Sequence, residues 1–278
     1  MTSTDQPEVG AFVDAAGIKT NYLEAGEGPP LVLVHGSGPG VTAYANWRLN
    51  MPALSRHFRV LAPDMAGFGF SDKPPGAAYG MAGWVDQLIG FLDALGIARA
   101  SLVGNSFGGG LAIRMAADHP ARVDRLVLMG AMGVSFPITE GLDNVWGYDP
   151  GFENMRRILD YFAYSRELVN DELAEVRYRA ALAPGVQEAF AAMFPAPRQR
   201  WVEAMATPEE KIRRIPHEAL IIHGRDDQVI PLENAYRLLS LIERAELHVF
   251  GRCGHWSQIE WADDFNSVLT RFLTRDAR

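Results

Sequence analysis

The chain has 278 residues and a mass of 30.6 kDa, which is enough for one domain with an insertion or for two domains at most. Hydrophobic residues make up 48% and charged residues 22% of the chain, a globular balance that excludes disordered, collagen-like and repeat architectures. The 26 Lys and Arg against 34 Asp and Glu give a net charge of −8. This charge argues against nucleic acid or an anionic membrane as a partner.

The first residues and the single cysteine bear on where the protein works. The start of the chain lacks a basic stretch followed by an apolar one, so we expect no signal peptide. No apolar run reaches the length of about 20 residues that a membrane-spanning helix needs. Cys253 is the only cysteine, which excludes an intrachain disulfide and a cysteine-based zinc site. We therefore expect a soluble, cytoplasmic protein that binds neither membranes nor nucleic acid.

Short apolar runs alternate with helical patterns along the chain. A hairpin is expected first, with strands at residues 12–14 and 19–24 around a turn at Gly17. The later runs show little polar alternation, which is typical of strands buried on both faces of a parallel sheet. These runs are residues 31–34, 60–62, 101–103, 126–129, 219–222 and 247–250, with helical patterns at 81–95, 107–118 and 232–241. The order predicts an α/β fold with a mostly parallel central sheet flanked by helices.

One stretch, from about residue 133 to residue 214, breaks this alternation. It shows no clear buried strand, and its helical segments are amphipathic and rich in charge. Pro and Gly interrupt it at residues 149–151, 184–185 and 195–197. We interpret residues 134–214 as a helical cap inserted into a core made of residues 1–133 and 215–278. The alternative is a pair of long crossover connections.

A serine between two glycines marks the candidate nucleophile. Gly104-Asn105-Ser106-Phe107-Gly108 follows a predicted strand and opens a helix. It matches the elbow G-x-S-x-G, in which a strained turn lifts the serine hydroxyl above the sheet. The pattern alone is only suggestive, but its position between strand and helix makes Ser106 a strong candidate.

A serine nucleophile needs a base, and the base needs a carboxylate that orients it. With this elbow the order along the chain is Ser, then Asp or Glu, then His. Asp226 and Asp227 follow the strand at 219–222, and His255 follows the strand at 247–250. Both loops lie beyond carboxyl ends of strands, where open α/β sheets bind their ligands. The order and placement therefore fit a triad.

The other six histidines are expected to have other roles. Structural roles are expected for five of them: His57, His119, His217, His223 and His248. His35 opens the loop His-Gly-Ser-Gly-Pro-Gly at residues 35–40, which has the spacing of neither a dinucleotide fingerprint nor a Walker A loop. We interpret this loop as one side of an oxyanion hole. Its donors would be the backbone N–H groups of Ser37 and Phe107.

Three of these motifs together are similar to those of one family. The loop 35–40 with Asn46-Trp47, the elbow Gly-Asn-Ser-Phe-Gly-Gly and the turn Gly-Arg-Cys-Gly-His-Trp at 251–256 resemble the meta-cleavage product hydrolases, α/β-hydrolase enzymes of aromatic degradation. The resemblance covers nearly the whole chain. Residues 133–143 and 194–201 look most like the 2-hydroxymuconate-semialdehyde hydrolases and their alkyl-substituted relatives. The family pattern G-x-x-D-x-x-x-P favours Asp227 over Asp226, for which a salt bridge or a cap is the alternative.

The resemblance implies a reaction. The family cleaves a carbon–carbon bond in 2-hydroxy-6-oxohexa-2,4-dienoates, releasing 2-hydroxypenta-2,4-dienoate and a small carboxylic acid. The dienol is first ketonised at C5, and Ser106 or water then attacks the C6 carbonyl. His255 would move the proton and Asp227 would fix its tautomer. We favour an acyl-enzyme on Ser106, and direct attack by water is the alternative.

The substrate carboxylate calls for a buried cation. In a helix over residues 171–180, Arg177 shares a side with Leu173, Val176 and Ala180, whereas Arg179 points away. Matching the family pattern, we assign Arg177 to the carboxylate as a bidentate partner. The alternative is an arginine that extends to the domain seam.

The remaining substrate contacts also follow from the resemblance. Asn46 and Asn105 fit family positions that hydrogen-bond the dienoate oxygens, and Gly36 and Gly38 join them in the loop. Trp256, next to His255, would form an aromatic wall. Asn46 capping a helix and Trp256 merely packing are the alternatives, and Cys253 is expected to be a buried, inert thiol.

Two other functions stay open alongside the carbon–carbon hydrolase. One is a carboxylesterase or lactonase on the same fold, which would need no buried cation. The other is a ligand sensor that keeps the triad. We expect no metal and no organic cofactor, and a homo-oligomer, at least a dimer, as in the family. The C6 substituent of the substrate is not predicted.

Overall fold

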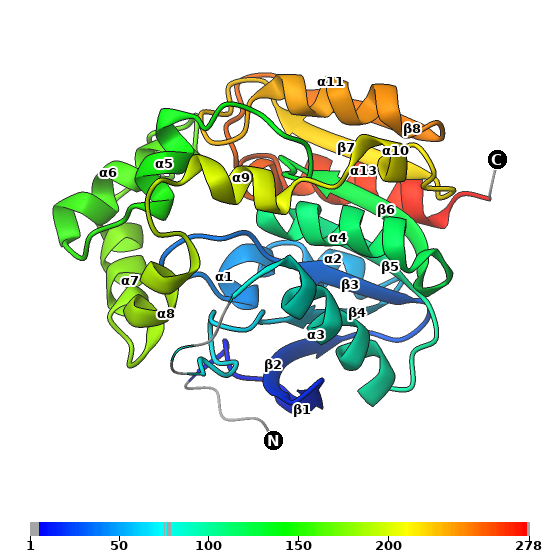
Figure 1. Cartoon of the computed structure of the whole chain (residues 1–278), viewed down its shortest axis with the longest axis horizontal. Coiled ribbons are helices and arrows are strands. Elements are labelled where there is room, and N and C mark those ends of the chain that lie inside the picture. Colours follow the sequence, from blue (N-terminus) through cyan, green and yellow to red (C-terminus); the bar gives the residue numbers. More distant parts are fainter. Residues whose placement is uncertain (1–5, 75, 77–78, 277–278) are drawn as a thin grey trace.

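A computed structural model describes residues 6–74, 76 and 79–276. Within these residues the centre is an eight-stranded sheet in the order β1-β2-β4-β3-β5-β6-β7-β8 (Figure 1). The strands are β1 Ala11–Ala15, β2 Ile18–Ala25, β3 Pro30–Val34, β4 Arg59–Pro63, β5 Ala100–Asn105, β6 Val123–Met129, β7 Ala219–Gly224 and β8 Ala245–Phe250. Strand β2 pairs antiparallel with β1 and β4, and all pairs from β4 to β8 are parallel. The predicted α/β fold with a mostly parallel sheet is confirmed.

Each apolar run that predicted a strand lies in one. The expected burial on both faces holds for the central strands, since β5 and β7 are buried along their whole length. Strand β8 differs, because only Phe250 of its residues is buried. The reason is its position: β8 is an edge strand with β7 as its single neighbour in the sheet.

Helices cover both faces of the sheet and form two apolar cores. The helices outside the β6–β7 connection are α1 Ala43–Trp47, α2 Met51–Leu54, α3 Met81–Ala94, α4 Phe107–Asp118, the 3₁₀ turn Pro120–Arg122, α11 Leu232–Leu241, α12 Ser257–Glu260 and α13 Ala262–Thr274. Along β3, Val32 packs in the core shared with α3, α4 and α11, whereas Leu31 and Leu33 pack in the core shared with α1, α2 and α13. This alternation is what a strand buried on both faces requires.

The connection from β6 to β7 consists of helices joined by loops. Its helices are α5 Glu140–Trp146, α6 Phe152–Phe162, α7 Asp171–Ala181, α8 Val186–Met193, α9 Gln199–Met205 and α10 Glu209–Ile212. Residues 130–218 are all described, and no strand occurs among them. Helices α5 to α8 lie beside one end of the sheet instead of covering a face (Figure 1). We use the word cap for residues 134–214.

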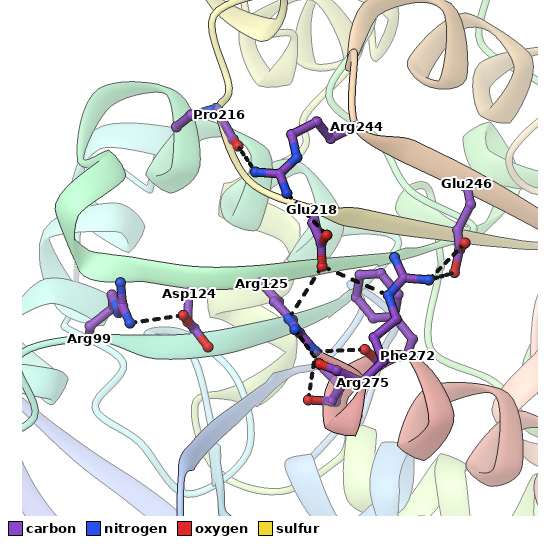
Figure 2. A network of polar contacts seen from close by, with 10 residues as sticks. Arg99, Asp124, Arg125, Pro216, Glu218, Arg244, Glu246, Phe272 and Arg275 are labelled. Atoms are coloured by element: carbon purple, nitrogen blue, oxygen red, sulfur yellow. Dashed lines mark hydrogen bonds and ion pairs between the residues drawn. The ribbon is translucent and has the colours of Figure 1, made fainter. Parts of the chain in front are cut away.

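The opposite end of the sheet is held by a network of arginines and carboxylates (Figure 2). Arg125 on β6 donates to the carbonyl oxygens of Phe272 and Leu273, both at 2.8 Å, near the end of α13. Its Nε lies 3.6 Å from a carboxylate oxygen of the buried Glu218, which also pairs with Arg244 at 3.1 Å. The network thus joins β6, the start of β7 and the C-terminal helix.

We expect Arg125→Ala to lower the free energy of unfolding by about 2–4 kcal/mol, because it leaves a buried carboxylate with fewer partners and helix carbonyls without donors. The melting temperature should fall by roughly 5–10 °C. Thermal unfolding measures this change in melting temperature. The control is Arg99→Ala, since Arg99 pairs with Asp124 at the exposed edge of the same network and should change stability by less than about 0.5 kcal/mol. Equal effects of the two changes would contradict the role given to Arg125.

Candidate active site

Ser106 stands between β5 and α4 in a conformation that few residues adopt. Its φ of +53° is in the left-handed region, one of three such non-glycine residues described. The turn is tight: a Cβ at position 104 would lie 2.3 Å from the Gly108 carbonyl oxygen, and one at 108 would lie 2.4 Å from that of Val34. Glycine is therefore required at both positions, as the elbow pattern predicts.

His255 and Asp227 meet beyond the ends of β8 and β7. His255 Nδ1 lies 2.7 Å from Asp227 Oδ2, and both side chains are buried. The other carboxylate oxygen, Oδ1, accepts the backbone N–H groups of Val229 and Ile230 at 2.8 and 2.9 Å. Burial raises the pKa of Asp227, but its interactions with His255 and His223 outweigh burial and hold that pKa below its ordinary value. The carboxylate is therefore ionised and oriented toward His255.

Asp226, the competing acid, has different surroundings. Its carboxylate pairs with Arg225 at 3.2 Å and accepts the backbone N–H of Cys253 at 3.4 Å. These are the contacts of a residue that stabilises the loop. His223 lies behind Asp227, with Nε2 3.0 Å from the Ile230 carbonyl oxygen and 3.4 Å from Asp227 Oδ2. The expected packed role of His223 fits, and its contact with Asp227 was not predicted.

The loop after β3 faces Ser106. His35 Nδ1 lies 2.7 Å from the Gly36 carbonyl oxygen, and His35 Nε2 accepts the backbone N–H of Met65 at 2.9 Å. Nδ1 therefore carries the proton and donates to that carbonyl. In a trans peptide the N–H points opposite to the C=O, so His35 also sets the direction of the Ser37 N–H. The Ser37 hydroxyl accepts a hydrogen bond from Trp146 Nε1 of the cap at 3.0 Å.

His35 makes stability depend on pH. Burial lowers its pKa from 6.5 to about 4, so the unfolded chain binds a proton in this range that the folded chain does not. Stability should therefore be complete above pH 6.5 and fall by about 3 kcal/mol on going down to pH 4. Urea unfolding from pH 7 to pH 4 measures this, with His35→Asn as the variant that cannot titrate. The same acid-side slope in both proteins would contradict the assignment.

A cavity of about 420 Å³ opens between the sheet and the cap. Most of the predicted site residues line it: Gly36, Ser37, Gly38, Asn46, Asn105, Ser106, Arg177, His255 and Trp256. Two do not. Asp227 lies behind His255, and Phe107 is a fully buried side chain whose predicted contribution is its backbone N–H. The structure thus brings the whole predicted set to one region.

Among the described residues, four buried polar atoms of side chains that line this cavity make no hydrogen bond. Three are donors, Asn46 Nδ2, Asn105 Nδ2 and Arg177 Nε, and the fourth is an acceptor, Gln258 Oε1. Arg177 is only 7% exposed, and burial lowers its pKa to about 10, so it remains a cation at neutral pH. Buried donors normally have acceptors. Three unpaired ones around one cavity therefore indicate a site for an oxygen-rich anion.

The prediction for helix α7 needs one correction. Arg177 is buried and Arg179 is exposed, as expected, but Val176 is 59% exposed and does not belong to the buried side. The buried residues of α7 are Ala174, Arg177 and Ala181, and Val176 borders the cavity. Helix α7 is therefore rotated about its axis, by one residue, relative to the orientation that the apolar pattern predicted. Asn46 does not cap its helix, because Thr42 does.

The cap supplies residues that sequence reasoning could not place. Phe162 lines the cavity and its ring stacks on Trp256, with centroids 4.7 Å apart and an interplanar angle of 4°. The cap aromatics Phe152, Tyr161, Phe190, Phe194 and Trp201 do not line the cavity. Leu142 of the cap and Val229 of the core add apolar wall. Trp146 was missed altogether, and no local pattern distinguishes it from other cap aromatics.

In the described part of the chain, no group of three or more His, Cys, Asp and Glu side chains is arranged to hold a metal ion. In the same residues, no helix combines the length and the apolar character needed to cross a membrane. Cys253 is buried, and burial raises the pKa of its thiol to about 12.

The sheet order and the elbow define an α/β hydrolase, and the family model described as the alpha/beta hydrolase fold matches residues 29–262. A 2-hydroxymuconate semialdehyde hydrolase of Pseudomonas sp. (strain CF600) is 61% identical, over 97% of this chain and 95% of that protein. A 2-hydroxy-6-oxo-2,4-heptadienoate hydrolase of Pseudomonas putida (strain F1) is also 61% identical, over 97% and 98%. A solved meta-cleavage product hydrolase, CumD from Pseudomonas fluorescens IP01, has a TM-score of 0.95 and 59% identity, covering 96% of this chain and 98% of that one. The chain belongs to the meta-cleavage product hydrolases, so the family predicted from the three motifs is confirmed.

Proposed function

We propose that the chain hydrolyses 2-hydroxy-6-oxohexa-2,4-dienoates with hydrogen or methyl at C6. The observation that carries this is the group of three unpaired donors, on Arg177, Asn46 and Asn105, around the cavity that Ser106 and His255 line. A neutral ester would leave Nε of the buried guanidinium without a hydrogen-bond acceptor, whereas the dienoate brings a carboxylate to it. The relatives named for a semialdehyde and for a heptadienoate support a small C6 group.

The binding step uses residues from the core and the cap. Arg177 pairs with the substrate carboxylate, while the side-chain amides of Asn46 and Asn105 donate to its oxygens. Trp256 and Phe162 form an aromatic wall against the flat diene. Gly38 permits this approach, because a Cβ there would lie 3.3 Å from Arg177 Nη2. The substrate is thereby held with C6 toward Ser106.

The chemical step needs a ketone that can release a carbon. The proton of the 2-hydroxyl moves to C5, which gives the 2,6-dioxo form. Ser106 Oγ then attacks C6 and passes its proton to His255, whose charge the Asp227 carboxylate stabilises. The new oxyanion lies against the N–H groups of Ser37 and Phe107.

Collapse of this intermediate breaks the C5–C6 bond. Its electron pair passes through the conjugated chain to the oxygen on C2, which takes the proton from His255 to give 2-hydroxypenta-2,4-dienoate. Water, deprotonated by His255, then hydrolyses the acyl group on Ser106 and releases formic or acetic acid. The sum is one substrate and one water giving two products.

We also propose that the core and the cap have different roles in the site, and that the protein forms a homo-oligomer. The core, residues 1–133 and 215–278, carries the reacting groups, and the cap supplies Arg177, Phe162 and Leu142 to the cavity wall. We propose a cytoplasmic location, and a homo-oligomer because of the family resemblance. Light scattering on the purified protein tests the assembly, and a monomer would overturn that part.

The experiment follows the visible absorbance of dienoates with H, methyl, isopropyl or phenyl at C6, beside p-nitrophenyl acetate. We expect the highest kcat/KM for H and methyl, well above that for the ester. Ester hydrolysis with inert dienoates would overturn the carbon–carbon hydrolase in favour of an esterase. A ranking led by phenyl would leave the reaction in place and overturn the small C6 group.

A further inference from the structure

Glu260, on the short helix α12, accepts backbone hydrogen bonds from two separate parts of the chain. Its Oε1 accepts the N–H of Gly254 at 2.7 Å. Its Oε2 accepts the N–H groups of Tyr164 and Ser165 at 2.8 and 3.1 Å. Gly254 immediately precedes His255 in the core, whereas Tyr164 and Ser165 follow α6 in the cap. One carboxylate therefore joins the turn that carries the histidine to the cap.

The cap contacts the turn that carries His255 on both sides of that residue. Trp256 N–H donates to the Phe162 carbonyl oxygen at 3.1 Å. Gly254 leaves no room for a side chain, because a Cβ there would lie 2.7 Å from the same Phe162 oxygen and 2.9 Å from Tyr164 N. The residue before His255 is thus held to the cap through Glu260, and the residue after it is held to the cap directly. The backbone of His255 is fixed by cap residues at both neighbours.

The chemistry of Glu260 suits a positioning role. The residue is half-buried, and in the described part of the chain it has no Lys or Arg as an ion-pair partner. Burial raises its pKa, and the three backbone N–H groups, together with a smaller contribution from the Cys253 side chain, oppose that effect. Hydrogen bonds to an ionised acceptor are stronger and shorter than neutral ones. A carboxylate held mainly by backbone donors fixes backbone geometry, and the geometry it fixes includes that of the His255 turn.

We propose that Glu260 is a positioning residue that ties the placement of His255 to the seating of the cap through residues 162–165. The connection from α6 to α7 borders the cavity with Glu167, Leu168 and Asn170, so a cap that lifts there releases the histidine turn as well. A seated cap gives an aligned His255, and a lifted cap gives an unaligned one. This inference rests on the proposed function for the role of His255.

The test uses Glu260→Gln, which keeps the size but has one acceptor oxygen, and Glu260→Asp, which keeps the charge but is too short for both partners. The first readout is the rate at which a small phosphonofluoridate labels Ser106, because labelling needs an aligned His255 and no cap contact to a substrate. We expect both variants to label about 10-fold to 100-fold more slowly, as misplacement by about 1 Å in an active site does. The dienoate kcat should fall at least as much. Asp264→Asn, an exposed change on the next helix, is the matched control and should label at the wild-type rate.

The second readout is amide hydrogen exchange in the segments 162–168 and 251–257. In Glu260→Gln both segments should exchange faster together, while the sheet stays protected. Faster exchange in the cap segment alone, or labelling of both variants at the wild-type rate, would overturn the proposal, because Glu260 would then be a local clamp of the cap. Neither readout uses a dienoate. An inactive wild-type enzyme would therefore count against the proposed function and leave the test of Glu260 intact.

Discussion

Replacing Ser106 with alanine is expected to lower kcat for the dienoate by about 10³-fold or more, while substrate affinity changes by less than about threefold. In the proposed mechanism the hydroxyl of Ser106, which stands in the elbow at φ +53°, supplies the nucleophile, so its loss removes the attack on C6. Binding depends instead on Arg177 and the two asparagines, which the change leaves in place. Stopped-flow absorbance gives kcat, and calorimetry with the inactive variant gives Kd.

The control for this experiment is Ser240→Ala, an exposed hydroxyl on α11 that bonds only to a carbonyl of its own helix. It should keep wild-type turnover. An equal loss of binding and turnover in Ser106→Ala would show that the serine holds the substrate instead of reacting with it. Turnover kept at the wild-type level would favour attack by water with His255 as the base.

Replacing Arg177 with glutamine is expected to lower kcat/KM for the dienoate by about 10²–10³-fold, equivalent to about 3–4 kcal/mol. The buried guanidinium is the one cation among the three unpaired donors, and no neutral side chain replaces the two parallel hydrogen bonds that it would make to the substrate carboxylate. Hydrolysis of p-nitrophenyl acetate, which has no carboxylate, should change little. Arg177→Lys should recover part of the loss, since it keeps the charge without the planar fork.

The melting temperature of Arg177→Gln distinguishes a binding role of Arg177 from a structural one. In the unliganded protein Arg177 is a buried cation whose Nε has no acceptor, so its desolvation is only partly compensated. Arg177→Gln should therefore leave the melting temperature unchanged or raise it, while it lowers kcat/KM. An arginine that only stabilised the domain seam would give the opposite pair of results.

Much of the core followed from local patterns. Continuous apolar runs predicted β3 to β7, because a strand buried on both faces has few polar positions. The helix at residues 232–241 was predicted with the bounds it has as α11. Strand β8 was expected to be as buried as the others, and its place at the edge of the sheet, a tertiary property, makes it half-exposed. The predicted buried side of α7 was wrong at Val176 for a similar reason, because the elements that a helix packs against set its rotation about its own axis.

The site followed from the order of loops. Ser106, Asp227 and His255 each follow a strand of a parallel sheet, so their approach was predictable once the strands were assigned. The contacts between Trp146 and Ser37 and between Glu260 and the cap were not, because they join residues about 95 to 109 positions apart with no motif of their own. Unpaired donors, such as Asn46 Nδ2, are also visible only when every neighbour is placed.

The cavity wall has a consequence for how such enzymes diversify. In the proposed mechanism the reacting groups stand in loops of the sheet, whereas part of the cavity wall comes from the cap. Under that proposal, changes in the cap can alter which substrate fits and keep the reacting groups. That freedom is limited wherever the cap contacts the core, for example where the indole of Trp146 meets the Ser37 hydroxyl, where residues 162–165 meet the His255 turn, and where the Thr139 hydroxyl donates to the Val229 carbonyl oxygen. A transplanted cap would have to match the host at all such contacts to yield an active chimera.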